Sequence, residues 1–182
     1  MNDTAFLDDA KLQLRKIQSM GERALEQAGE ARLFKKPDSE SNSLAILMKH
    51  ISGNLKSRWT RFLETDGEKP DRNRDSEFEI GPDDTPARLR ERWREGWKIL
   101  FDTLDALRPG DLERTVTIRR EPHTVLQAVN RQVSHYSLHV GQMIYLAKHL
   151  AGPEWKSMSI PRGKSKEFEV AKDGKPYLAE PK

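Results

Sequence analysis

The sequence predicts an all-α protein, a four-helix bundle with a long crossover between its second and third helices. Apolar residues recur three and four positions apart in four separate segments, which is the spacing of one buried helix face. Capping residues, glycine and proline separate these segments. At 182 residues the chain is long enough for one hydrophobic core and short for two. We therefore expect the bundle in residues 1–152 and, in residues 153–182, an irregular tail that packs on or over it.

The first two helices are predicted from their apolar stripes. The first spans about residues 4–28 and ends before Gly29, and the second follows the polar connection 37–43. The stripes consist of Leu7, Ala10, Leu14, Ile17, Ala24 and Ala28 in the first helix and of Leu44, Leu47, Ile51, Leu55, Trp59 and Phe62 in the second. The segment 64–84 then holds turn and charged residues without a sustained period. A connection of this length can cross the end of a bundle.

The third helix is predicted to begin at Thr85-Pro86, a good N-cap and first-turn pair, and to end before Pro109-Gly110. Its apolar stripe consists of Leu89, Trp93, Trp97, Leu100, Leu104 and Leu107. The tryptophans at these core positions indicate packing rather than a stacking platform. The alternating, β-branched run 116–118 favours a short β-hairpin before the last helix.

The fourth helix is predicted to start at a capping box formed by Thr124 and Gln127 and to end at Gly152-Pro153. Its apolar stripe consists of Val125, Val129, Tyr136, Val140, Met143, Ala147 and Leu150. On a helical wheel, His135 and His139 fall on the flank of this stripe. They should therefore line an edge of the core, where a pocket could open.

Composition excludes several classes of function. The chain has no cysteine, which rules out disulfides, thiolate metal ligands and a cysteine nucleophile. A net charge of +3, from 32 basic and 29 acidic residues, gives little support for a nucleic-acid partner. No apolar run is long enough to span a membrane, and the N-terminus lacks the pattern of a signal peptide. We therefore expect a cytoplasmic protein.

Histidine is then the main candidate for site chemistry. A four-residue separation stacks His135 and His139 on one helix face, and His50, beside the second stripe, is the best third partner. Zinc and nickel accept neutral imidazole nitrogen, and three histidines leave a coordination position open for water or substrate. The competing interpretation is that the three histidines form no metal site. In that case two of them are partly exposed on a polar flank and the third lies at the edge of the core. His123 and His149 are interpreted as structural or solvated.

Two enzyme motifs are incomplete in this sequence. Gly163-Lys164-Ser165 is similar to the end of a P-loop, but Met158 stands where its first glycine is required. Ser134 precedes His135, yet adjacent helical residues point apart and no nucleophile elbow is present. Neither a nucleotide site nor a serine triad is predicted.

The pattern resembles the DinB-like superfamily of four-helix metalloproteins, and more closely an uncharacterised bacterial branch of it. The stretches that carry the resemblance are 50–58, 66–69, 72–78, 131–142 and 159–165, the fourth of which contains His135 to His139 followed by Gly141-Gln142. The resemblance implies a homodimer that holds a divalent metal, nickel or zinc, on His50, His135 and His139. Characterised relatives include transferases and isomerases that use a low-molecular-weight thiol.

These observations lead to a first hypothesis, a metal-dependent enzyme with a small-molecule ligand, which acts as a small-thiol S-transferase or as a hydrolase of a small electrophile. Asn54, Arg131 and Gln142 are the polar residues expected to support the ligands or contact substrate, and Arg162 in the tail is expected to close over the pocket. No general base is identified. The alternative is a non-catalytic, stress-related dimeric protein that binds metal. Nucleic-acid binding is a third and weaker interpretation.

Overall fold

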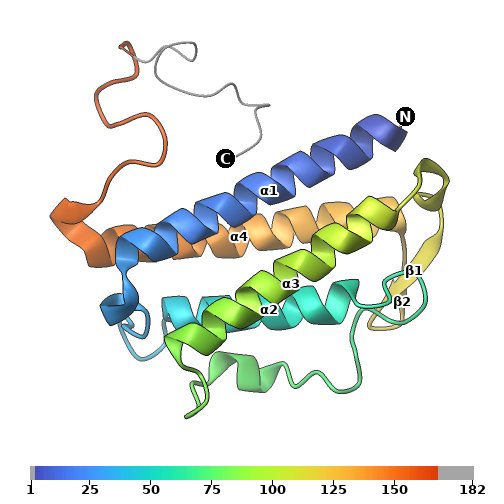
Figure 1. Cartoon of the computed structure of the whole chain (residues 1–182), viewed down its shortest axis with the longest axis horizontal. Helices are drawn as coiled ribbons and strands as arrows, with labels where there is room; N and C mark the ends of the chain where they lie inside the picture. Colours follow the sequence, from blue (N-terminus) through green and yellow to red (C-terminus); the bar gives the residue numbers. More distant parts are fainter. Residues whose placement is uncertain (1–2, 168–182) are drawn as a thin grey trace.

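The computed structural model describes residues 3–167 and shows a helical bundle with one small antiparallel hairpin (Figure 1). This confirms the predicted fold class, including the hairpin before the last helix. The elements are α1 (Asp3–Ala28), η1 (Glu30–Arg32), α2 (Leu44–Trp59), η2 (Asp75–Phe78), α3 (Pro86–Ala106), η3 (Pro109–Asp111), β1 (Thr115–Ile118), β2 (Glu121–Thr124), α4 (Val125–Ala151) and η4 (Gly152–Glu154), where η marks a 3-10 helix. Within the described residues, every helix is too short or too polar to cross a membrane.

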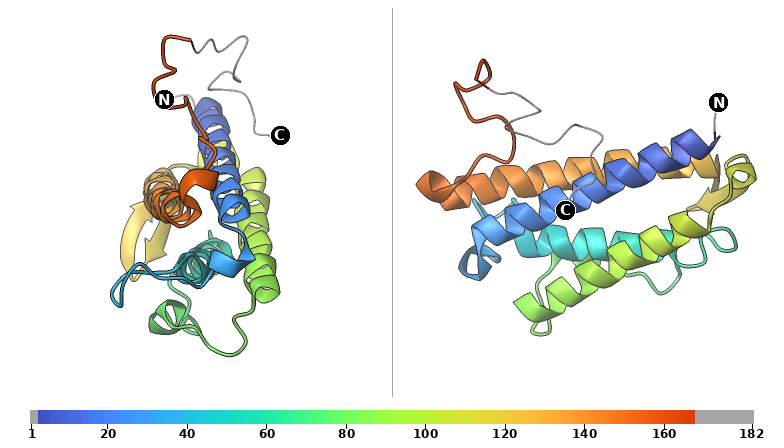
Figure 2. Two further views of the ribbon diagram at one scale, coloured as in Figure 1. Left: turned by 90° about the vertical axis from the view of Figure 1, so that its left-hand side faces the viewer. Right: turned by 45° about the horizontal axis from the view of Figure 1, so that its top comes forward.

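The four long helices pack as two close pairs. α1 lies along α4 and α2 lies along α3, while a smaller contact joins α2 to α4 (Figure 2). The chain runs in the same direction in α2 and α3 and in the opposite direction in α4 (Figure 1). A parallel α2–α3 pair requires the connection 60–85 to carry the chain back along the bundle, as the length of the aperiodic segment predicted.

Side-chain caps fix the starts of three helices. Ser43 accepts a hydrogen bond from the Ile46 N–H, and Thr85 accepts one from the Arg88 N–H, at 3.2 and 3.3 Å. Thr124 forms the predicted capping box at the start of α4. The second helix is shorter than its apolar stripe indicated, because the backbone of Thr60 is extended and Arg61 has a φ of 49°. α2 therefore ends at Trp59.

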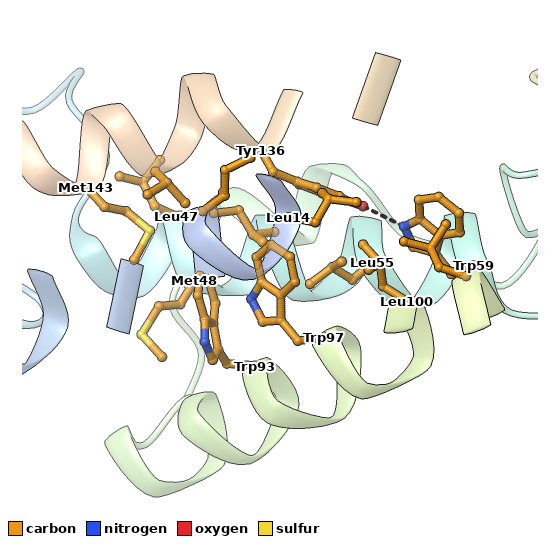
Figure 3. Packing of buried hydrophobic residues seen from close by; sticks show 14 of the residues in the cluster. Leu14, Leu47, Met48, Leu55, Trp59, Trp93, Trp97, Leu100, Tyr136 and Met143 are labelled. Carbon is orange, nitrogen blue, oxygen red and sulfur yellow. Dashed lines mark hydrogen bonds between the residues drawn. The ribbon is translucent and has the colours of Figure 1, made fainter. Parts of the chain in front are cut away.

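The core consists of the predicted apolar stripes, with aromatic residues at its centre (Figure 3). Trp59, Trp97 and Tyr136 are fully buried, and the Trp59 Nε1–H donates a hydrogen bond of 3.1 Å to the Tyr136 hydroxyl. The rings of Trp97 and Tyr136 lie 5.5 Å apart. The tryptophans are thus packing residues inside the bundle, as their spacing indicated. Burying each large apolar side chain stabilises the fold by about 2–3 kcal/mol.

The hairpin is tied to the connection that follows α2. Its turn consists of Arg119 and Arg120, with φ values of 56° and 67°. Both backbone N–H groups donate to the Asp66 carboxylate, at 2.9 and 2.8 Å, and the Gly67 N–H donates to the Thr117 carbonyl at 2.8 Å. The start of the long connection is therefore held against the hairpin, next to the end of α2 (Figure 1).

The described part of the tail leaves the bundle at the end of α4. Trp155 packs partly against the core, and the Lys156 N–H donates to the Gln27 side chain at 2.7 Å. Beyond this point, residues 157–167 are almost all exposed and extend away from the helices (Figure 1). Residues 168–182, which belong to the predicted tail, lie outside the described residues.

Candidate metal centre

Three histidines meet where α2 and α4 run side by side. His50 comes from α2, and His135 and His139 come from consecutive turns of α4. The ring centroid of His50 lies 5.5 Å from that of His135 and 4.7 Å from that of His139, and the two rings on α4 lie 4.6 Å apart. One ring nitrogen from each histidine lies within 4.8 Å of the others, an arrangement that could hold a metal ion. The structure thus brings His50 together with His135 and His139, the three histidines that the sequence analysis proposed as one site.

His50 is oriented by a buried carboxylate from the long connection. Its Nδ1 lies 2.8 Å from Oε2 of Glu77, which is part of η2 and is 6% exposed. Burial raises the pKa of Glu77, but hydrogen bonds with His50 and Arg72 outweigh burial and leave this pKa below its usual value. An ionised carboxylate can only accept, so the Nδ1 of His50 carries the proton. Its Nε2 is then left as the free ligand atom, as in metal sites where a carboxylate supports a histidine.

Arg72 in turn fixes Glu77. Its Nε and Nη2 donate to the two Glu77 oxygens at 2.8 and 2.9 Å, a bidentate pair in which both side chains are almost completely buried. Phe78 follows Glu77 in η2, and its ring lies 4.9 Å from that of His50 and covers it. The segment η2 therefore supplies both the support and the cover of this ligand.

A glycine on α2 makes room for the carboxylate. A Cβ placed on Gly53 would overlap Oε1 of Glu77 and would lie 2.8 Å from its Cδ. Gly53 stands three positions after His50, on the same side of the helix. A residue with a side chain at position 53 would displace Glu77 from the place where it reaches His50.

His139 is supported from its own helix. Its Nδ1 lies 3.0 Å from Oε1 of Gln142, an amide oxygen that can only accept, so Nε2 is again left free. Gln142 also lines an outer groove of about 910 Å³ between α4 and the loop 37–42. Through Gln142, the wall of this groove is connected to His139.

His135 differs from the other two because its Nδ1 is buried and has no hydrogen-bond partner among residues 3–167. Burial lowers the pKa of His135 to about 3, with smaller contributions from His139, His50, Arg131 and Arg58. Burial also lowers the pKa of His139. Both rings are therefore neutral near pH 7, the form in which imidazole binds a metal. Three imidazoles, one of which has an orphaned buried nitrogen, form a donor set that fits a divalent ion.

The other residues expected at the site have different surroundings. The Asn54 Oδ1 accepts a hydrogen bond of 2.9 Å from the Tyr136 hydroxyl, inside the core. Burial raises the pKa of Tyr136, so this hydroxyl stays neutral. Arg131 is exposed, but its charge reaches His135, whose pKa it helps to lower. Arg162 is exposed in the described part of the tail.

Sequence reasoning did not find the supporting roles of Glu77 and Arg72. Both lie in the aperiodic connection, and Glu77 is 27 positions from the histidine that it contacts. No spacing rule links a loop carboxylate to a helical histidine at that separation. The one available signal was the glycine on the histidine's side of α2, because a helical glycine often marks a close approach.

Comparison with known proteins identifies one family. A family model described as "Protein of unknown function (DUF1572)" matches residues 2–164, which include all three histidines, Glu77 and Arg72. No curated protein and no solved structure matches the chain.

Proposed function

The chain belongs to the DUF1572 family of proteins of unknown function, and we propose that it binds one divalent metal ion on His50, His135 and His139 as the centre of a metal-dependent enzyme. The observation that carries this proposal is the support of the ligands. His50 and His139 each have Nδ1 engaged by an acceptor, at 2.8 and 3.0 Å, which leaves both Nε2 atoms free for the ion.

A metal bound at this site would act as a Lewis acid and lower the pKa of a bound thiol or water. The protein's own residues perform the remaining tasks. Glu77 and Gln142 hold the ligand rings in one orientation, and Phe78 covers His50. Imidazole ligands carry no negative charge, so a bound ion would keep its full positive charge toward the open position. No side chain at the site is assigned as a general base.

The proposed reaction is transfer of a small thiol, or hydrolysis of a small electrophile. The absence of cysteine means that a thiol would have to be supplied as a substrate. Nickel and zinc are the proposed metals, because both accept imidazole nitrogen. The assignment to the DinB-like superfamily, the homodimer and the cytoplasmic location stay predictions that accompany this proposal.

Metal analysis tests the site. Protein purified without a histidine tag or added metal should contain about one equivalent of nickel or zinc per chain. His135→Ala should lose most of it, while His149→Ala, an exposed histidine in the last turn of the same helix, should retain it. A wild-type protein without metal, or a His135→Ala variant that keeps its metal, would contradict the proposal.

Turnover needs a separate measurement. Metal-loaded wild-type protein should accelerate the reaction of a small thiol with a small electrophile, or hydrolysis of the electrophile, and His135→Ala should show only the uncatalysed rate. A wild-type rate equal to that of His135→Ala would favour the alternative, a protein that binds metal without turnover.

A further inference from the structure

We propose that Arg58 and Gln132, next to the histidine cluster, bind the carboxylate of a small substrate whose other end reaches the metal. This inference rests on the proposed function and names the substrate class of the same site. Arg58 on α2 and Gln132 on α4 are both buried, with exposed fractions of 3% and 1%. In the described residues, Nε and Nη1 of Arg58 and both amide atoms of Gln132 have no hydrogen-bond partner.

Because α2 and α4 run antiparallel (Figure 1), Arg58 and Gln132 lie on the same side of the histidine cluster along the bundle. Asn54 contacts Tyr136 across the two helices. Arg58 stands two turns after His50, and Gln132 stands about one turn before His135, so both lie toward the ends of α2 and α4 that face the hairpin.

Hydrogen-bond donors that are buried and have no acceptor indicate that a hydrogen-bond partner is missing. A buried polar group without a hydrogen bond destabilises the fold, and a charged group does so more strongly. Arg58 keeps its charge, although burial lowers its pKa. Glycine at position 67 leaves space for the guanidinium, because a Cβ there would lie 3.0 Å from Nη1. The fold therefore accommodates a guanidinium but leaves most of its donors unused.

Among residues 3–167, the one hydrogen-bond partner of Arg58 is a weakly held carboxylate. Its Nη2 lies 3.4 Å from Oε2 of Glu68, which also accepts from Arg72 at 3.3 Å and from Arg119 at 3.2 Å. Strong guanidinium–carboxylate bonds measure about 2.7–2.9 Å, the range that Arg72 achieves with Glu77. Glu68 is 23% exposed and shared by three guanidinium groups, so a ligand carboxylate with shorter bonds could replace it at Arg58.

The test compares two small thiols on the cobalt(II)-loaded protein. 3-Mercaptopropionate and 2-mercaptoethanol are similar in size, and the first carries a carboxylate where the second carries a hydroxyl. Absorption from the cobalt–thiolate bond reports the binding of each. We expect wild-type protein to bind 3-mercaptopropionate at least tenfold more tightly, the effect of about one charge-assisted hydrogen bond. Arg58→Gln should reduce this preference to less than about twofold.

Control variants separate local recognition from general charge and from misfolding. Arg61→Gln removes the same charge from an exposed residue three positions along and should keep the preference. Gln132→Met removes two orphaned polar atoms without a large change in volume, so it should raise the thermal midpoint and still weaken 3-mercaptopropionate binding several-fold. Equal cobalt stoichiometry in all variants shows that the histidine site is intact.

Each outcome has a definite meaning. Equal affinity of the two thiols, a preference that survives in Arg58→Gln, or no binding of either thiol to cobalt-loaded protein would overturn the carboxylate site and leave the metal site standing. Failure of wild-type protein to take up cobalt would overturn the proposed function, and this inference with it.

Discussion

The buried bond between Glu77 and His50 is the residue-scale feature on which the candidate site depends most. In this bond, a side chain from the 3-10 helix η2 holds His50, a candidate metal ligand on α2. The bond exists only because Gly53 has no side chain. Arg72 prevents Glu77 from moving aside, since it bonds both carboxylate oxygens. A change at position 53 should therefore affect the metal site without touching a ligand.

We predict that Gly53→Ala lowers metal affinity about tenfold, because the new Cβ pushes Glu77 off His50. The global stability of the metal-free protein should change little, since alanine favours the helix by about 1 kcal/mol and offsets the lost contact. Metal competition against a chromophoric chelator measures the affinity. Gly141→Ala is the matched control, because a Cβ there meets nothing within 4 Å. Equal affinities of the two variants would show that Glu77 does not support the site.

At the scale of elements, the β1–β2 hairpin is held in an unfavourable turn. Arginine at both turn positions has positive φ, a conformation that favours glycine or asparagine. Asp66 compensates by accepting the N–H groups of Arg119 and Arg120. Burial raises the pKa of Asp66, but backbone N–H donors from Glu68, Arg120 and Arg119 outweigh burial and lower this pKa to about 2. The hairpin and the connection after α2 are thus coupled through one carboxylate.

This coupling predicts a dependence of stability on pH. The pKa of Asp66 is lower in the folded state than in the unfolded chain, where it is about 4, so its contribution is complete above about pH 4 and is lost as pH falls to about 2. Asp66→Asn should lower the free energy of unfolding by about 1–2 kcal/mol at pH 7 and by almost nothing near pH 2.

Urea unfolding at several pH values measures this difference. Asp83→Asn serves as the control, because Asp83 is exposed and lies before α3, away from the hairpin. If the free energy of unfolding of Asp66→Asn were lower than that of wild type by the same amount at pH 7 and pH 2, the carboxylate charge would not stabilise the turn.

At the scale of the whole molecule, the histidine cluster bridges the two helix pairs. His50 belongs to the α2–α3 pair, and His135 and His139 belong to the α1–α4 pair. The direct contact between α2 and α4 is small beside the contacts within each pair. An ion held by ligands from both sides would therefore join the two halves of the bundle.

Metal should accordingly raise the thermal midpoint. At a metal concentration about 1,000 times the Kd, binding adds about 4 kcal/mol, which for a domain of this size shifts the midpoint by about 10 °C. A metal chelator should reverse the shift in wild-type protein, and His50→Ala should show none. Differential scanning calorimetry provides the measurement, and an unchanged wild-type midpoint at saturating metal would exclude the bridging role.

The sequence by itself determined the helices and the composition of the core. The stripes of three- and four-residue spacing, the capping box at Thr124 and the Thr85-Pro86 start are local signals, because they depend on neighbours within one or two turns. The same periodicity placed His135 beside His139. The end of α2 was less predictable, because Phe62 continues the apolar spacing although the backbone has already turned at Thr60.

Only the tertiary structure decided how the histidine pair is completed and supported. His50 reaches His135 and His139 because α2 and α4 are adjacent and antiparallel, a pairing that helix periodicity does not specify. Glu77 and Arg72 arrive from a connection without regular spacing. The unused donors of Arg58 became apparent only once its burial was known. Local pattern reflects which face of a helix is buried, whereas long-range packing sets which side chains meet there.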